Sequence, residues 1–166
     1  MPRCSAKTCW DWCARRPRTP CRPRRSRDAG VTITAEYVQG IFKQLEQGDG
    51  SAFFDHVAED VDWTVMGTHP LAGHYPSKKA FIDGTFAKLD KVLPDGARLR
   101  LEHCIVAGDQ AVVELHAMST ALNGLRFDNR YCWIVYFQDG RIVRVRAYLD
   151  SALVERLLRE NPIAQA

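Results

Sequence analysis

Apolar side chains recur at intervals of three and four residues in three stretches of the first half of the chain. This spacing predicts three amphipathic helices, which begin near Thr34, Ser51 and Ser77. Between the second and third helix, residues 61–66 predict a strand and residues 67–73 a loop. The apolar positions of the three helices are Val38, Ile41, Phe42 and Leu45, then Phe53, Phe54 and Val57, then Phe81, Ile82, Phe86, Leu89 and Val92.

The second half of the chain changes to a period of two, which is typical of strands. We predict strands over 99–107, 111–121, 127–137 and 142–149, joined by short turns that contain glycine. A last helix from Asp150 would bury Leu153, Val154 and Leu157. The expected fold class is therefore α+β, with three N-terminal helices packed on an antiparallel sheet and one C-terminal helix.

The turn at Asn123-Gly124 sets the predicted register of the sheet. A two-residue turn there pairs residue 118 with 129, 116 with 131 and 114 with 133. One sheet face then gathers Glu114, His116, Met118, Asn129, Tyr131 and Trp133. The register of the next hairpin has two alternatives. A three-residue turn over 138–140 adds Val145, Ala147 and Leu149 to this face, whereas a two-residue turn over 139–140 adds Arg146, Tyr148 and Asp150.

The opposite face of the predicted sheet is also largely apolar. It consists of Val113, Leu115, Ala117, Cys132, Ile134 and Tyr136. A sheet that is apolar on both faces needs a packing partner on each face, and the helices can pack on only one of them. We therefore expect a homodimer that forms through the outer sheet face.

Charge divides the chain at about residue 30. Residues 1–28 contain nine Lys and Arg and two Asp, whereas the remaining residues contain 14 basic and 18 acidic side chains. The first segment, 1–30, also holds four of the six cysteines and shows no apolar periodicity, so we expect it to be disordered and hypothesise that it is upstream sequence outside the native protein. The domain over 31–166 is acidic, so we expect no nucleic-acid partner. No apolar run is long enough for a membrane helix, and we expect a cytoplasmic protein.

The polar members of the first face are the candidate site. His116 changes charge near neutral pH, and Glu114 on the same strand would orient it. Tyr131 and Asn129 could donate hydrogen bonds to a substrate oxygen. The predicted apolar walls for a ring-shaped ligand are Trp63, Trp133, Met118, Thr64 and Ala147. Catalysis, binding without chemistry and an ordinary core all remain open for this cluster.

Other titratable residues give weaker signals. His69 and His74 flank the predicted loop and are expected to be solvated. Together with His116 they lack a compact metal-ligand spacing, so we predict no metal. No glycine-rich phosphate loop is present, and we expect no cofactor. Asp150 is expected to cap the last helix rather than act as an acid.

Several stretches of the sequence resemble the nuclear transport factor 2-like superfamily, in particular its SnoaL-like branch. They are residues 60–67 (DVDWTVMG), 70–75 (PLAGHY), 129–131 (NRY), 139–142 (DGRI) and 148–150 (YLD). The resemblance covers about residues 33–160 and implies a cone-shaped fold in which a curved sheet wraps a pocket. It favours the three-residue turn in the last hairpin. Members include isomerases, cyclases, epoxide hydrolases, dehydratases and proteins without catalytic activity, so the fold does not choose among these functions.

The catalytic residues of these families match this chain poorly. The isomerase positions fall at Thr64, Trp133 and Ile41, none of which can perform the corresponding roles. The epoxide hydrolase positions fall at Glu114, His116 and Ala147, which breaks that triad as well. The resemblance to polyketide cyclases leaves His116 paired with Glu114. We therefore expect a cofactor-independent isomerase, cyclase, dehydratase or hydrolase that moves protons on a small hydrophobic molecule; the alternative is a non-catalytic binding or dimeric accessory module.

Overall fold

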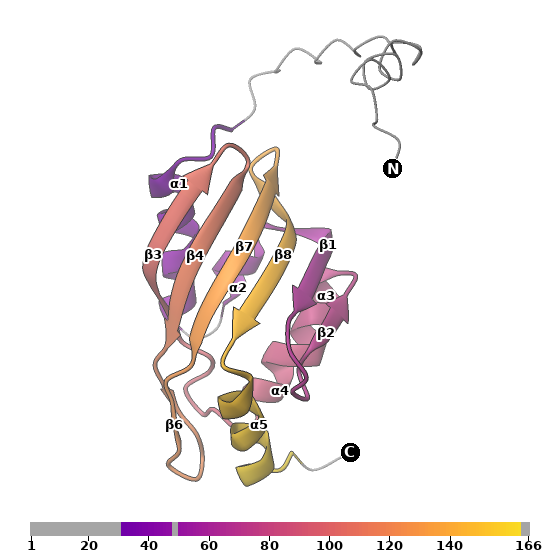
Figure 1. Cartoon of the computed structure of the whole chain (residues 1–166), viewed down its shortest axis with the longest axis vertical. Coiled ribbons are helices and arrows are strands. Elements are labelled where there is room, and N and C mark those ends of the chain that lie inside the picture. Colours follow the sequence, from indigo (N-terminus) through magenta and orange to yellow (C-terminus); the bar gives the residue numbers. More distant parts are fainter. Residues whose placement is uncertain (1–30, 48–49, 164–166) are drawn as a thin grey trace, which may run out of the picture.

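A six-stranded mixed sheet, with helices behind it in the view of Figure 1, forms the body of the protein. The computed structural model describes residues 31–47 and 50–163. The predicted disordered segment over 1–30 lies outside the described residues. The α+β class is as predicted, and the elements below show which parts of the prediction hold in detail.

Helices form at each of the three predicted places. Helix α1 (Ala35–Phe42) continues into the 3₁₀ turn η2 (Lys43–Gln47), and α2 (Ser51–Phe54) is a single turn that ends before Val57. The third stretch combines α3 (Lys78–Phe81), the π-helical turn η3 (Ile82–Phe86) and α4 (Ala87–Leu89).

Two of the predicted helix starts are capped by side chains. Thr34 Oγ1 accepts a hydrogen bond from the backbone N–H of Tyr37 at 3.2 Å. Ser77 Oγ accepts one from the N–H of Ala80 at 3.1 Å. Each hydroxyl satisfies an N–H at the start of its helix that has no partner within the helix.

The strand order of the main sheet is β2-β1-β8-β7-β4-β3. The prediction of a wholly antiparallel sheet is wrong at one pairing, because β1 runs parallel to β8. The long connection from β1 to β8 through α3 and the other strands allows this parallel contact. A separate two-stranded ladder, β5–β6, extends the β4–β7 hairpin. The strands are β1 (Val57–Val65), β2 (Gly73–Tyr75), β3 (Leu99–Ala107), β4 (Gln110–Ala117), β5 (Ser119–Thr120), β6 (Arg126–Phe127), β7 (Arg130–Gln138) and β8 (Arg141–Leu149).

The predicted register between β4 and β7 is wrong by one residue. Trp133 pairs with Val113 and Tyr131 with Leu115, so neither lies beside Glu114 or His116. The hairpin contains a three-residue loop in which Gly124 has a φ of 83° and Asn123 keeps a negative φ. A two-residue type I′ turn requires positive φ at both positions, and the extra loop residue shifts every pair.

The β7–β8 hairpin has the strand pairing that was expected from a three-residue turn, but its turn has two residues. Asp139 and Gly140 both have positive φ, at 51° and 79°, and form the two-residue turn that pairs Gln138 with Arg141. A bulge next to Phe137 then shifts the register by one residue. As a result Val145, Ala147 and Leu149 share a face with Trp133 and Tyr131, as the three-residue turn would also have arranged.

The sheet has a buried inner face and an outer face. Val113, Leu115 and Ala117 belong to the inner face, which is packed under the helices. The outer face of β4, β7 and β8 carries Val112, Glu114, His116, Cys132, Ile134, Tyr136, Arg144, Arg146 and Tyr148. The second face is therefore less apolar than predicted, because the register error had assigned three inner residues to it. Within the described residues, no helix is long and apolar enough to cross a membrane.

Helix α5 (Ser151–Glu160) is fixed to the sheet at its first turn. Asp150 Oδ1 accepts hydrogen bonds from the N–H groups of Ala152 and Leu153 at 3.0 and 3.2 Å, which confirms the predicted cap. Asn129 is fully buried and makes two hydrogen bonds to the backbone of Asp150. Its Nδ2 donates to the Asp150 carbonyl at 3.1 Å, and its Oδ1 accepts from the Asp150 N–H at 3.0 Å.

We expect Asn129→Ala to lower the free energy of unfolding by about 2–3 kcal/mol, because it leaves the N–H and carbonyl of Asp150 without partners. Urea denaturation measures the change. Asp128→Ala, which removes an exposed partner of Arg126, is the control and should change stability by less than about 0.5 kcal/mol. Equal effects of the two variants would contradict the role given to Asn129.

Candidate functional site

A small cavity of about 40 Å³ lies between the inner sheet face, the helical stretch α3–α4 and the loop after β1. Its walls are almost wholly apolar, and its described lining contains no Asp, Glu, Lys or Arg. This volume has room for water molecules rather than for a ring-shaped ligand, so a larger ligand requires lining side chains to move.

Aromatic rings form one wall of the cavity. The Trp63 ring stacks on Phe81 with centroids 3.8 Å apart, and it meets Trp133 edge-on at 5.2 Å. Tyr131 contacts Trp133 at 6.1 Å in another edge-to-face pair. Because each ring supports the next, the positions of the two indole groups are well defined.

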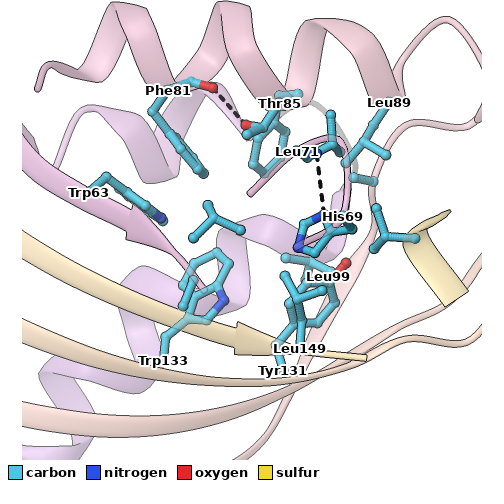
Figure 2. A pocket seen from close by; sticks show the side chains of 15 residues that line it. Trp63, His69, Leu71, Phe81, Thr85, Leu89, Leu99, Tyr131, Trp133 and Leu149 are labelled. Carbon is cyan, nitrogen blue, oxygen red and sulfur yellow. Dashed lines mark hydrogen bonds between the residues drawn. The ribbon is translucent and has the colours of Figure 1, made fainter. Parts of the chain in front are cut away.

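Three nitrogen atoms in this lining have no hydrogen-bond partner among the described residues. They are Nε1 of Trp63, Nε1 of Trp133 and Nε2 of His69, and all three are buried. In Figure 2 these nitrogens border the same space. Buried polar groups are normally paired, so three unpaired groups around one cavity indicate a place for a polar ligand atom.

His69 is held in one orientation by its own turn. Residues 69–72 form a turn in which the N–H of Ala72 donates to the His69 carbonyl at 2.9 Å. The N–H of Leu71 donates to His69 Nδ1 at 3.2 Å, as the dashed line in Figure 2 shows. Because Nδ1 accepts this bond, the neutral imidazole carries its proton on Nε2.

Burial controls the charge of the titratable groups in the cavity. Desolvation lowers the pKa of His69. The nearby Met66 backbone carbonyl opposes this shift as a weak acceptor for the ring, although it forms no hydrogen bond of normal geometry with Nε2. Desolvation also raises the pKa of Tyr131. Both side chains are therefore uncharged near neutral pH, and each carries a proton.

The predicted single cluster of four polar groups is divided by the sheet. Tyr131 lines the inner cavity, whereas Glu114 and His116 belong to the outer face. Asn129 is occupied by the backbone of Asp150. Glu114 and His116 therefore do not reach a ligand in the inner cavity, and the structure does not test a role for them at the outer face.

The predicted apolar walls are partly recovered. Trp63, Trp133 and Ala147 line the cavity, while Thr64 and Met118 do not. Thr64 follows Trp63 on β1 and so belongs to the other side of the strand. Met118 lies beyond the end of β4, where its N–H donates to the Arg98 carbonyl.

His69 is the main residue that sequence reasoning missed. It was expected to be solvated, but only 5% of its surface is exposed; this expectation was wrong, whereas His74 is exposed as expected. The signal in the sequence is His69-Pro70, since proline favours the second position of the turn that folds the histidine inward.

The outer face has its own charged cluster around Glu102, at a bulge in β3. Arg100 and Arg130 pair with its carboxylate, and His116 Nδ1 lies 3.7 Å from Oε1. Hydrogen bonding to Arg100 is the main cause of the lowered pKa of Glu102. Within the described residues, no group of three His, Cys, Asp or Glu is arranged to hold a metal ion.

Comparison with known families identifies the domain. The model of the SnoaL-like domain matches residues 38–145. The chain belongs to the SnoaL-like domain family. The match includes β1, the helical stretch α3–α4 and most of the strands that follow, and therefore most of the residues that line the cavity.

Two curated relatives are fungal proteins of the same kind. The dimerizing cyclase phiC of a fungal species is 27% identical over 151 residues, which cover 89% of this chain and 62% of the relative. The dimerizing cyclase tstC of Talaromyces stipitatus is 26% identical over 136 residues, covering 79% and 60%. This chain thus spans about 60% of the length of the curated relatives that it matches.

Solved structures agree on the fold. An NTF2-like protein from Burkholderia thailandensis is 24% identical, covers 74% of this chain and 95% of its own, and has a TM-score of 0.64. TerC, co-crystallised with polyporic acid, is 24% identical with a TM-score of 0.62, covering 75% and 96%. At these identities the likeness establishes the NTF2-like fold of SnoaL-like domains.

The lowered pKa of His69 predicts how stability depends on pH. The unfolded chain protonates this imidazole at a higher pH than the folded protein, so its contribution is fully present above its ordinary pKa of 6.5 and is lost as pH falls below that value. We expect the free energy of unfolding to fall from about pH 7 to about pH 5 more steeply in the wild type than in His69→Gln. Urea denaturation at several pH values measures this, with exposed His103→Gln as the control. Equal slopes for wild type and His69→Gln would show that His69 is not held neutral.

Proposed function

We propose that this SnoaL-like protein is a cofactor-independent enzyme that isomerises or cyclises a small hydrophobic molecule in its inner cavity. The observation that carries the proposal is a set of three N–H groups in a largely apolar lining, none of which has a partner among residues 31–47 and 50–163. The curated relatives, both named as cyclases, support the reaction class.

The donors suit a reaction in which negative charge develops on a substrate oxygen. Indole N–H groups donate and do not accept, and His69 presents Nε2–H because Leu71 occupies Nδ1. Such donors, fixed before the reaction, stabilise an oxyanion in a site of low dielectric constant. A neutral imidazole N–H can polarise a carbonyl in the same way.

In this proposal His69, rather than the predicted His116, acts on the substrate, as a hydrogen-bond donor to the developing oxyanion. Tyr131, which burial keeps protonated, supplies a further hydroxyl donor. Trp63, Trp133 and Ala147 bind the apolar body of the substrate. The side chains of Leu71 and Leu89 also line the cavity, and their rotation would widen it for a ring.

Exchange of carbonyl-adjacent protons tests this assignment without knowledge of the natural substrate. The protein is incubated with cyclopentenone in D₂O, and deuterium incorporation is followed by NMR. Solvent hydroxide removes the carbonyl-adjacent proton, because the described lining holds no carboxylate, and the enolate oxygen that forms accepts a hydrogen bond from Nε2–H of His69. We expect exchange above the solvent rate that falls about 100-fold in His69→Phe, within the usual range for loss of one oxyanion donor. His116→Phe should keep the wild-type rate.

Two outcomes would contradict the proposal. Cyclopentenone that binds but exchanges only at the solvent rate would indicate binding without chemistry. Loss of exchange in His116→Phe, with retention in His69→Phe, would move the site to the outer face.

We also propose that two copies pair through the outer sheet face. Support comes from Ile105 on β3 and Tyr148 on β8, which are 57% and 41% exposed on this face and are separated by β4 and β7. The face also carries both signs of charge, with Glu114 on β4 and Arg146 on β8, and a two-fold axis can bring opposite charges together.

Sedimentation velocity measures this pairing. We expect the wild type to sediment as a dimer and Ile105→Lys as a folded monomer, because a buried lysine without a partner is costly. Leu122→Lys is the control: Leu122 is 66% exposed but lies in the β5–β6 loop, so this variant should remain dimeric. A monomeric wild type would contradict the proposal.

A further inference from the structure

Tyr75 links the His69 turn to the aromatic wall of the cavity. It lies on the edge strand β2 and its hydroxyl donates a hydrogen bond to the carbonyl of Leu71 at 2.9 Å. Its ring contacts Phe81 edge-on with centroids 5.7 Å apart, and Phe81 stacks on Trp63. One side chain therefore contacts both the turn that carries His69 and the rings that face it.

The hydrogen bond from Tyr75 completes the fixation of one peptide unit. The carbonyl of Leu71 accepts from Tyr75, and the N–H of the same peptide unit, that of Ala72, donates to the His69 carbonyl. With this unit held at both ends, the turn keeps the N–H of Leu71 directed at His69 Nδ1. The orientation of the imidazole thus depends on a bond two residues away.

The position of Tyr75 in turn requires glycine at residue 84. A Cβ atom added to Gly84 would lie 2.3 Å from Cε1 of Tyr75, far inside any normal contact. Gly84 lies within the π-helical turn η3, which interrupts the helix beside the cavity. Turns of this kind are frequent at functional sites, and here the turn leaves the space that the Tyr75 ring fills.

We infer that Tyr75, seated against Gly84, is a positioning residue that selects the tautomer of His69. Through the Leu71 turn it keeps Nδ1 as the acceptor and leaves Nε2–H facing the cavity. This choice sets the chemistry, because a neutral imidazole with its proton on Nε2 donates a hydrogen bond to the ligand, whereas the other tautomer would accept one. The inference deepens the proposed function and rests on it for its catalytic consequence.

Long-range ¹H–¹⁵N correlation spectra of histidine-labelled protein test the inference without any ligand, with the His69 signal assigned by its absence in His69→Phe. The wild type should show only the Nε2–H tautomer above neutral pH. Tyr75→Phe removes one oxygen atom and should produce a substantial Nδ1–H population. Tyr37→Phe is the matched control, because the Tyr37 hydroxyl donates to the Gly140 carbonyl at 2.7 Å in a similar bond elsewhere in the fold. It should leave the tautomer unchanged.

Proton exchange of cyclopentenone gives the functional readout. Tyr75→Phe should slow exchange about tenfold with little change in the affinity for cyclopentenone, and in the His69→Phe background it should have no further effect. An unchanged His69 tautomer in Tyr75→Phe, or the same change in Tyr37→Phe, would overturn the inference. If the tautomer changes in Tyr75→Phe alone but His69→Phe retains full exchange, the positioning role stands and the proposed function fails.

Discussion

Strand register decides which side chains reach the inner cavity, and the rest of the site depends on it. A shift of one residue exchanges the two faces of a strand. In the β4–β7 hairpin one extra loop residue, made possible by the positive φ of Gly124, places Trp133 and Tyr131 inside and leaves His116 outside. In the β7–β8 hairpin a bulge returns Ala147 to the inside. Two small backbone features therefore determine the chemistry of the cavity.

The positions of the helices and strands can be predicted from local sequence, but the register and pairing of the strands cannot. Apolar spacing and the caps at Thr34, Ser77 and Asp150 were sufficient to place the helices. Asn123-Gly124 indicates a hairpin correctly, yet both two- and three-residue loops accept that pair, and bulges leave no clear local pattern. The parallel contact of β1 with β8 joins residues far apart in the chain, and strand periodicity carries no information about it. The burial of His69 depends on the same long-range packing.

The cavity combines a largely apolar lining with hydrogen-bond donors that have no partners in the part of the chain that the structure describes. Unpaired buried N–H groups destabilise the folded protein, and under the proposed function a substrate oxygen that accepts their hydrogen bonds offsets this destabilisation. Burial keeps His69 neutral and Tyr131 protonated, so the described lining can donate to an oxygen atom without bringing a fixed charge into the core. The SnoaL-like fold forms the inner cavity, and the side chains of this particular chain determine which ligands the cavity can bind.

The indole N–H resonances of Trp63 and Trp133 give the most direct test of the claim that these donors form one binding site. Each signal can be assigned by substitution of its own tryptophan with phenylalanine, and both are then followed while cyclopentenone is added. If the account is right, both resonances move downfield together as the ketone oxygen accepts their hydrogen bonds. If both stay in place while signals of the outer sheet face around His116 move, the inner cavity is not where this protein binds its ligand.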